Sequence, residues 1–218
     1  MSNNNECGRV LLLHGIWMTG LEMGWLGHRL EAAGFQVERF HYPSLSGSPV
    51  ENAQRLQQYL QQREYDCLHF VAHSLGGLVL LNLFDLFPDQ PPGRVVLLGA
   101  PVRGSIVARR LVRHGWGRPL IGRSGERGLI EGAPAWNGGR ELGLIAGTNG
   151  LLGVGRLVGG LMGENDGTVL LEETEIPTAT DRRLYPAGHM GLLFSSEVAA
   201  DVAGFLHNGR FPPARSDR

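Results

Sequence analysis

The fold is decided by the stretch Phe70-Val71-Ala72-His73-Ser74-Leu75-Gly76-Gly77, which joins a short apolar run to a longer helical segment. A strand-to-helix turn of this kind is sharp, and it needs small residues two positions before and two after the serine, because a larger side chain would clash with neighbouring backbone. Ala72 and Gly76 meet this requirement. The pattern therefore predicts Ser74 at the carboxyl end of a strand, with a helix N-terminus behind it and the Leu75 N–H free to donate.

Short apolar runs alternate with longer amphipathic segments along the whole chain, which is typical of an α/β fold with a mostly parallel sheet and helices on both faces. We expect about six strands, at residues 9–13, 35–40, 68–71, 94–98, 141–146 and 182–185. We expect helices at residues 21–33, 49–63, 75–87, 106–113 and 195–206. Ser195 or Ser196 is the candidate N-cap of the last helix.

Length and charge limit the classes of protein to consider. The 218 residues suffice for one domain with a continuous core, which we expect at residues 9–208, with flexible ends at 1–8 and 209–218. The 20 basic and 21 acidic residues give a net charge of -1, so no strong field draws nucleic acid or an anionic membrane toward the chain. A small, weakly charged substrate is the expected partner, and the oligomeric state is left open.

The cysteines and the N-terminus indicate in which cellular compartment the protein is expected. Two cysteines, Cys7 and Cys67, are too few for a disulfide scaffold. Residues 1–6 have neither the basic nor the apolar region of a signal peptide. No apolar run approaches the roughly 18 residues that a spanning helix needs. We therefore expect a soluble, cytoplasmic protein without integral membrane association.

Three further segments place polar residues after expected strands. They are Leu13-His14-Gly15-Ile16-Trp17 after the first strand, Gly163-Glu164-Asn165-Asp166-Gly167-Thr168-Val169 after the fifth, and Pro186-Ala187-Gly188-His189-Met190-Gly191 after the last. Since the carboxyl ends of parallel strands meet at one edge of a sheet, Ser74, Asp166 and His189 are expected to converge there. This is the residue set of nucleophilic catalysis by a serine.

With these four segments in this order, the chain resembles the small bacterial lipases and esterases of the α/β-hydrolase superfamily. The family pattern is G-x-S-x-G, and Ala72 stands here in place of the first glycine, as it does in the minimal lipases without a cap domain. The resemblance covers residues 9–206 approximately. It implies a minimal α/β-hydrolase fold with no large cap, and hydrolysis of carboxylic esters or lipids through an acyl-enzyme intermediate without a cofactor or metal.

The resemblance also implies a role for each member of the set. Ser74 is the nucleophile, and His189 takes its proton and later protonates the leaving alcohol. Asp166 orients His189 and stabilises the imidazolium, with Glu164 as the second choice for the acid. The oxyanion would be bound by the backbone N–H of Leu75 and that of Ile16, with Trp17 as the alternative to Ile16.

Other residues around these segments are expected to contact the substrate. They are His14, Gly15, Trp17, His73, Leu161, Met162 and Met190. For His14 and His73, the competing interpretation is a structural role. The glycine-rich, apolar segment 147–163 is interpreted either as a mobile rim for an acyl chain or, equally, as a plain flexible loop.

Several less specific interpretations compete with these. Ser74 would also suit an ordinary helix N-cap, and Asp166-Gly167 an ordinary turn. The run from Gly99 to Ser105 follows a strand, but it lacks the lysine of a phosphate loop, so we interpret it as a pocket wall. The same residues would serve a thioesterase, a lactonase or an acyltransferase. A non-catalytic binding protein with this fold is the alternative from another class.

Overall fold

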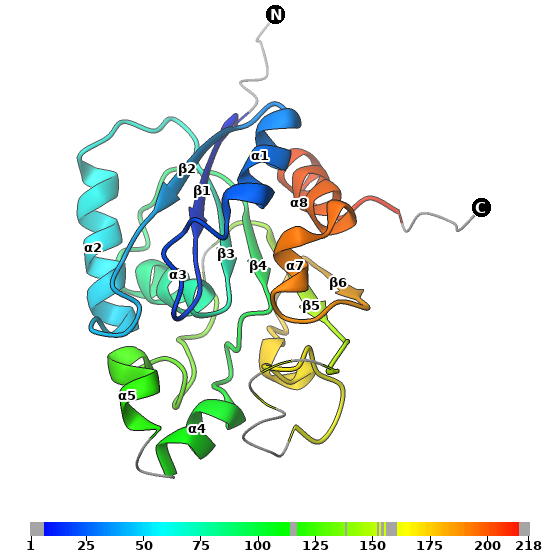
Figure 1. Cartoon of the computed structure of the whole chain (residues 1–218). Coiled ribbons are helices and arrows are strands. Elements are labelled where there is room, and N and C mark those ends of the chain that lie inside the picture. The colour runs from blue at the N-terminus through cyan, green and yellow to red at the C-terminus, as the bar shows by residue number, and fades with distance from the viewer. Residues whose placement is uncertain are drawn as a thin grey trace, which may run out of the picture.

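A computed structural model describes residues 7–113, 117–137, 139–151, 153, 155 and 161–213. A single six-stranded sheet in the order β2-β1-β3-β4-β5-β6 runs through the molecule (Figure 1). The strands are β1 (Arg9–Leu13), β2 (Gln36–Phe40), β3 (His69–His73), β4 (Val95–Leu98), β5 (Leu142–Gly147) and β6 (Asp181–Tyr185). Every neighbouring pair is parallel, so all six carboxyl ends lie along one edge of the sheet.

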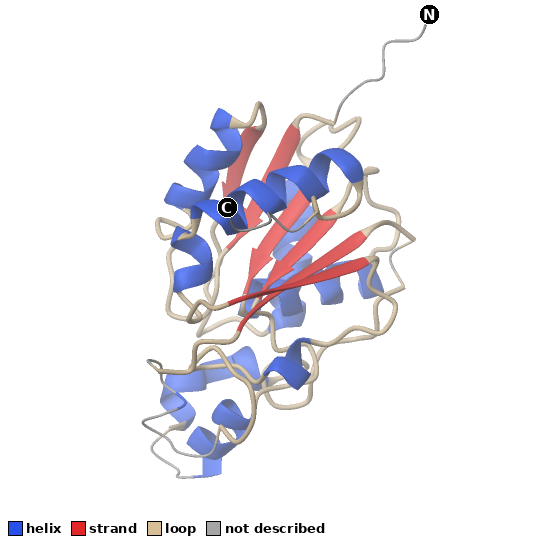
Figure 2. Ribbon diagram, turned by 90° about the vertical axis from the view of Figure 1, so that its right-hand side faces the viewer, coloured by secondary structure: helices blue, strands red, loops and turns tan. Residues whose placement is uncertain are grey.

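Helices cover both faces of this sheet (Figure 2). The elements between strands are α1 (Gly24–Ala32), α2 (Pro49–Gln61), α3 (Leu75–Leu86), α4 (Ile106–Arg113), α5 (Arg118–Ile121) and the 3₁₀ turns η1 (Gly122–Gly125) and η2 (Leu171–Thr174), and the last strand is followed by α7 (Gly191–Phe194) and α8 (Ser196–Asn208). Helices α2 and α3 pack together, while α1 packs on α7 and α8. Within the described residues, no helix combines the length and the apolar character needed to span a bilayer.

The apolar core has two halves, one on each face of the sheet. Leu11 and Leu13 of β1 belong to the half under α2 and α3, and Val10 and Leu12 belong to the half under α1 and α8. This alternation follows from the two-residue period of a strand. A strand covered on both faces is apolar at every position, which explains the continuous apolar runs in the sequence.

The six expected strands are all present, and their ends differ from prediction by at most two residues. The largest shift is at β3, which continues through Ala72 to His73, so that Ser74 follows the strand directly. Helix α8 begins at Ser196 with Ser195 as its N-cap, whose hydroxyl accepts from the Val198 N–H. The four-residue elements α5, η1, η2 and α7 were not predicted, because so short a segment carries no readable period.

Both described ends of the chain are held more firmly than expected. Cys7 forms a disulfide with Cys67 across a sequence separation of 60 residues. At the other end, Phe211 is buried, and its ring lies 4.9 Å from that of Phe205. Cys7 and Phe211 lie in the two segments expected to be flexible, and the cross-link and the aromatic contact that hold them leave no periodic signal in the sequence. Residues 1–6 and 214–218 lie outside the described residues.

Candidate functional site

The serine turn at the carboxyl end of β3 has the strained backbone that its sequence predicts. Ser74 has φ 54° and ψ -122°, a conformation that costs free energy in any residue with a Cβ. Its N–H donates to the carbonyl oxygen of Leu98 in β4 at 2.9 Å. A Cβ atom at position 76 would lie 2.7 Å from the carbonyl oxygen of His14. Glycine is therefore required there for α3 to approach β1.

Among the described residues, the serine turn leaves a hydroxyl and a backbone N–H without a hydrogen-bond partner. Ser74 is almost fully buried, yet its hydroxyl makes no hydrogen bond in the described part of the chain. Leu75 is the first residue of α3, where a backbone N–H has no acceptor within the helix. A hydroxyl and an N–H donor thus lie together at a positively polarised helix end.

Asp166 and His189 form a buried pair at the same edge of the sheet. His189 Nδ1 donates to Asp166 Oδ2 at 2.6 Å. The other carboxylate oxygen of Asp166 accepts from the N–H groups of Thr168 and Val169, at 3.0 and 2.8 Å. In addition, the His189 N–H donates to the Asp166 carbonyl oxygen at 2.9 Å. Because Nδ1 carries the proton in this pair, Nε2 of His189 is left as an acceptor.

Two glycines allow these groups to approach the turn. A Cβ atom at position 99 would lie 3.1 Å from His189 Nδ1 and 3.2 Å from Asp166 Oδ2. Gly99 also has φ 55°, which favours glycine. A Cβ atom at position 15 would lie 3.1 Å from both Ser74 Cβ and His73 Nδ1. Backbone without side chains therefore packs directly against the serine and the Asp166–His189 pair.

His73 connects the serine turn to the His189 loop. Its Nε2 donates to the carbonyl oxygen of His189 at 3.1 Å, and the two rings lie 4.6 Å apart. Complete burial holds the pKa of His73 well below its usual value, and repulsion from His189 lowers it further. His73 is therefore neutral, with its proton on Nε2. This contact places His189 beside the residue that precedes Ser74.

His14 makes only internal contacts. Its ring stacks on Tyr42 at 4.3 Å, and its carbonyl oxygen accepts from the Tyr42 hydroxyl at 2.5 Å. The ring nitrogens lie 2.9 Å from the Gly15 carbonyl oxygen and 3.4 Å from the Tyr42 backbone nitrogen. Burial is the largest cause of its lowered pKa. These contacts favour the second interpretation of His14 given above, that of a structural residue that holds the turn after β1.

The turn after β1 reaches across to α5. Trp17 has φ 59°, and its indole Nε1–H donates to the carbonyl oxygen of Leu120 at 2.8 Å. The Gly15 N–H points to the sulfur of Met18 at 3.2 Å. Ile16 is partly buried against the core half under α2 and α3. The candidate oxyanion turn is thus supported by a segment more than a hundred residues later in the chain.

The remaining predicted residues lie along the rim of this edge. Trp17 and Met190 are nearly half exposed, Met162 is 87% exposed, and Leu161 packs partly against the core. Segment 147–163 is described only in part, and residues 152, 154 and 156–160 lie outside the described residues. Glu164, the second choice for the acid, is exposed, whereas Asp166 contacts His189 directly.

Sequence reasoning did not identify two residues of this site. Tyr42 and Leu120 contact the turn after β1 from distant parts of the chain, and nothing in their sequence neighbourhood indicates this. Gly99 belongs to the expected pocket wall, and a glycine directly after a buried strand is a signal for close approach of another group. The described residues contain no group of three or more His, Cys, Asp or Glu side chains placed to hold a metal ion.

Comparison with known proteins supports the fold. No protein-family model matches the sequence, and no curated protein matches it. Among solved structures, the lipase BlEst2 of Bacillus licheniformis has 17% sequence identity and a TM-score of 0.64, over 94% of this chain and 92% of the lipase. The carboxylesterase CesB of Bacillus subtilis has 13% identity and a TM-score of 0.60, over 95% of this chain and 86% of its own.

A third similar structure is RedJ, a thioesterase from the prodiginine biosynthetic pathway of Streptomyces coelicolor. It has 13% identity and a TM-score of 0.61, over 90% of this chain and 84% of its own. Together with the six parallel strands and the helices on both faces, these likenesses show that the chain has the α/β-hydrolase fold.

Proposed function

We propose that this chain is a serine hydrolase that cleaves carboxylic esters through an acyl-enzyme intermediate on Ser74. The observation that supports this most strongly is the buried 2.6 Å contact between Asp166 and His189, at the sheet edge where Ser74 has a strained backbone and an unbonded hydroxyl. An isolated pair of buried ionisable groups would be costly in a structural role. Beside a serine at a helix N-terminus, it provides a base of the required tautomer.

In the proposed first step, His189 Nε2 takes the proton of the Ser74 hydroxyl while Oγ attacks the ester carbonyl carbon. The N–H groups of Leu75 and Ile16 bind the oxyanion that forms, and Asp166 stabilises the imidazolium. The imidazolium then gives its proton to the leaving alcohol. Water attacks the acyl-enzyme in the second half of the cycle and releases the acid. We expect the hydrogen bond between His189 Nε2 and the Ser74 hydroxyl to form in the complex with substrate, because such catalytic contacts often tighten there.

The exposed apolar side chains at the rim suit an uncharged acyl group. Trp17, Met190 and Met162 would contact it as it enters from solvent. Thioesters are the second candidate substrate class, because the same three residues cleave them and a thioesterase is among the proteins of similar structure.

Covalent labelling tests the proposal. A fluorophosphonate probe should label the protein at Ser74, and p-nitrophenyl butyrate should be hydrolysed. Ser74→Ala should abolish both. If wild-type protein fails to react with the probe while the fold is intact by circular dichroism, the chain is a binding protein with a hydrolase fold. Parallel assays with matched oxygen and sulfur esters separate the esterase from the thioesterase.

A further inference from the structure

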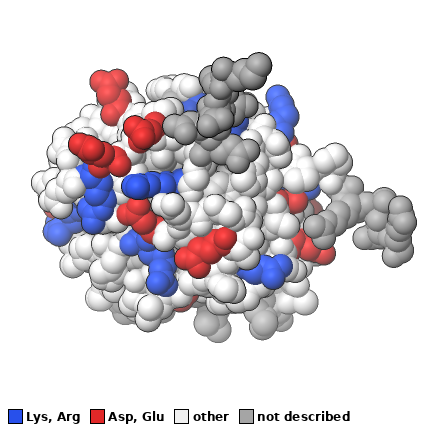
Figure 3. Space-filling model, turned by 90° about the horizontal axis from the view of Figure 1, so that it is seen from above, with Lys and Arg blue, Asp and Glu red and all other residues white. Residues whose placement is uncertain are grey.

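The disulfide lies at the edge of the sheet opposite the candidate site. Cys7 precedes β1 and Cys67 precedes β3, so their bond joins two segments that enter the sheet at its amino edge. Viewed from above, acidic and basic side chains are interspersed on this face of the molecule (Figure 3). Both cysteines are partly exposed. A dissolved molecule can therefore reach the sulfur atoms without unfolding the protein.

Two hollows meet at the disulfide. Both cysteines line an open hollow of about 490 Å³ together with His69, Arg94, Arg140 and Glu141. They also line a second hollow of about 290 Å³, whose charged groups are Arg9, Glu64 and Asp66. The larger hollow thus has two guanidinium groups against one carboxylate, and the smaller has two carboxylates against one guanidinium. The larger one is the approach that favours an anion.

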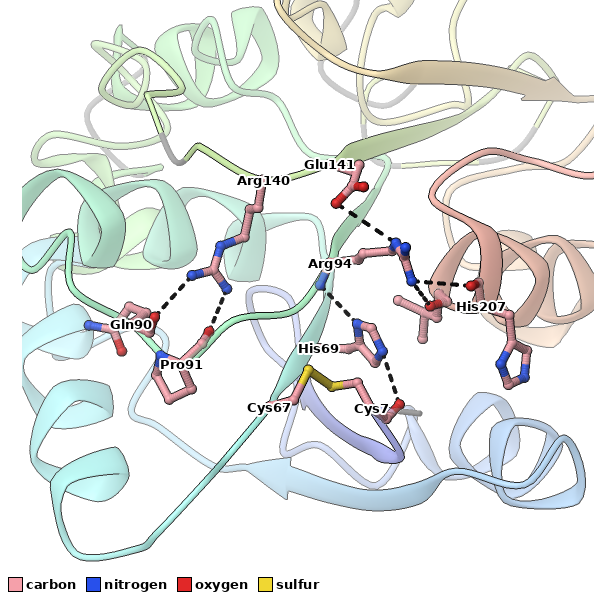
Figure 4. Close-up of a disulfide and its surroundings, with 10 residues drawn as sticks. Cys7, Cys67, His69, Gln90, Pro91, Arg94, Arg140, Glu141 and His207 are labelled. Atoms are coloured by element: carbon pink, nitrogen blue, oxygen red, sulfur yellow. Dashed lines mark hydrogen bonds and ion pairs between the residues drawn. A yellow bond between two sulfur atoms is a disulfide. The ribbon is translucent and has the colours of Figure 1, made fainter. Parts of the chain in front are cut away.

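The positive charge of the larger hollow is only partly neutralised. Arg94 Nε lies 3.8 Å from a carboxylate oxygen of Glu141, and Arg94 also donates to the carbonyl oxygens of Leu206 and His207 (Figure 4). Arg140 donates only to the carbonyl oxygens of Gln90 and Pro91 and has no ion pair in the described part of the chain. Carbonyl groups carry no net charge, so the charge of Arg140 remains.

His69 does not add to this charge. Its Nδ1 accepts from the Arg94 N–H at 2.8 Å, and its Nε2 donates to the Cys7 carbonyl oxygen at 3.1 Å. With one nitrogen as acceptor and the other as donor, the ring is neutral. It holds Cys7 beside the start of β3 and keeps the disulfide at the wall of the hollow (Figure 4).

We propose that the Cys7–Cys67 disulfide is a thiol-exchange site, and that the Arg94–Arg140 hollow selects small anionic thiols as its reaction partners. The sulfur of a thiolate attacks one Sγ atom, the bond between Cys7 and Cys67 breaks, and the other Sγ leaves as a thiolate that takes a proton from water. The product is a mixed disulfide. A second thiol attacks it, releases the remaining cysteine and departs as the oxidised thiol dimer, so two thiols are oxidised and one disulfide is reduced.

The selectivity has a definite expected size. A net charge of one unit at about 6 Å in water changes the local concentration of a singly charged thiol roughly threefold, so an anionic thiol should react about tenfold faster than a cationic one. The ratio should fall toward one in 1 M salt, where the Debye length is about 3 Å. Neutral thiols should react at an intermediate rate.

The experiment compares 2-mercaptoethanesulfonate, 2-mercaptoethanol and cysteamine on the folded full-length protein at low ionic strength. Adducts are trapped with iodoacetamide and measured by intact mass. Each rate is divided by the rate of the same thiol with bis(2-hydroxyethyl) disulfide, because thiols differ in intrinsic nucleophilicity. The expected result is the tenfold preference for the sulfonate over cysteamine.

A series of substitutions that change the charge at Arg140 separates the effect of that charge from any effect on folding. Arg140→Lys should keep the preference, Arg140→Gln should reduce it to about one, and Arg140→Glu should reverse it. Arg118→Gln in α5, at the other edge of the sheet, is the matched control and should behave as wild type. Equal normalised rates for the three thiols, an unchanged preference in Arg140→Glu, or adducts that form only as the protein unfolds would each overturn the proposal. None of these readouts uses ester hydrolysis, so they are independent of the proposed function.

Discussion

The two edges of the sheet are built from the same strands and have opposite properties. At the carboxyl edge, Ser74 and Trp17 have positive φ, and the Ser74 hydroxyl has no partner among the described residues. At the amino edge, His69 uses both ring nitrogens, and a disulfide joins the segments that enter β1 and β3. Strain and unbonded polar groups reduce stability and are retained where chemistry needs them. At the other edge, the disulfide and the two hydrogen bonds of His69 add stability.

The comparison predicts that substitutions at the carboxyl edge change activity and those at the amino edge change stability. The largest expected effect is that of Ser74→Ala or His189→Ala, each of which should lower kcat for p-nitrophenyl butyrate by about 10⁴ to 10⁶. The midpoint of denaturant unfolding should change little. Near-normal turnover by Ser74→Ala would remove the serine from the mechanism.

The next effect distinguishes two carboxylates. Asp166→Asn should lower kcat by about 10⁴, because an amide in contact with His189 Nδ1 favours the wrong tautomer. Glu164→Gln is the matched control, since this side chain is exposed and two residues away. A greater loss in Glu164→Gln than in Asp166→Asn would assign the acid to Glu164.

At the amino edge, the double variant Cys7→Ser/Cys67→Ser should lose stability and keep activity. The disulfide closes a loop of about 60 residues, so its removal should lower the free energy of unfolding by about 4 kcal/mol in the chain-entropy model. Turnover at 25 °C should stay within about twofold of wild type. Denaturant unfolding and ester hydrolysis measured on the same samples test both halves, and a large fall in kcat without unfolding would show that the two edges are coupled.

The neutral state of His69 predicts a pH dependence of stability. Burial, with a further contribution from the charge of Arg94, lowers the pKa of His69 to about 4. Between pH 4 and 6.5 the unfolded chain therefore binds more protons than the folded one, so stability is complete above pH 6.5 and decreases as the pH falls toward 4. The loss should reach about 3 kcal/mol at most.

Urea unfolding at pH 7 and at pH 4.5 measures this loss, and His69→Gln is the control. The variant should be less stable at pH 7 and less sensitive to the pH change than wild type. An equal pH sensitivity in both proteins would show that other groups cause it.

The smallest predicted effect concerns the support of the oxyanion turn. Trp17→Phe removes the indole donor to Leu120 and keeps an aromatic ring, so kcat should fall about three- to tenfold, as expected for the loss of one hydrogen bond of about 1 kcal/mol. Trp25→Phe in α1 is the control and should leave kcat unchanged. Equal kcat values for both variants would show that the contact with α5 does not support the turn.

The cytoplasmic location expected from the N-terminus remains a prediction, and the disulfide counts against it. Disulfides persist in oxidising compartments and are rare where glutathione and thioredoxin keep thiols reduced. The sequence contains two cysteines in all. It does not predict that they pair, because their distance in space depends on the register of β1 against β3.

The local sequence determined the strands, the main helices and the position of the serine turn. The apolar runs of β3, β4 and β5 are strong signals because these central strands are buried at every position, and Ala72 and Gly76 mark a turn with no room for larger side chains. The sequence also predicted that His189 follows the last strand closely and that Asp166 lies in the long segment between the fifth and sixth strands, as the structure has them.

Only the tertiary structure decided which groups contact each other across that framework. The selection of Asp166 over Glu164 as the partner of His189, the contact of His73 with the His189 loop, and the bond between Trp17 and Leu120 each join residues at least 23 positions apart. Such contacts depend on how loops pack after the sheet has formed. A sequence pattern indicates the period of an element and where small side chains are needed. It does not indicate the direction in which a loop turns.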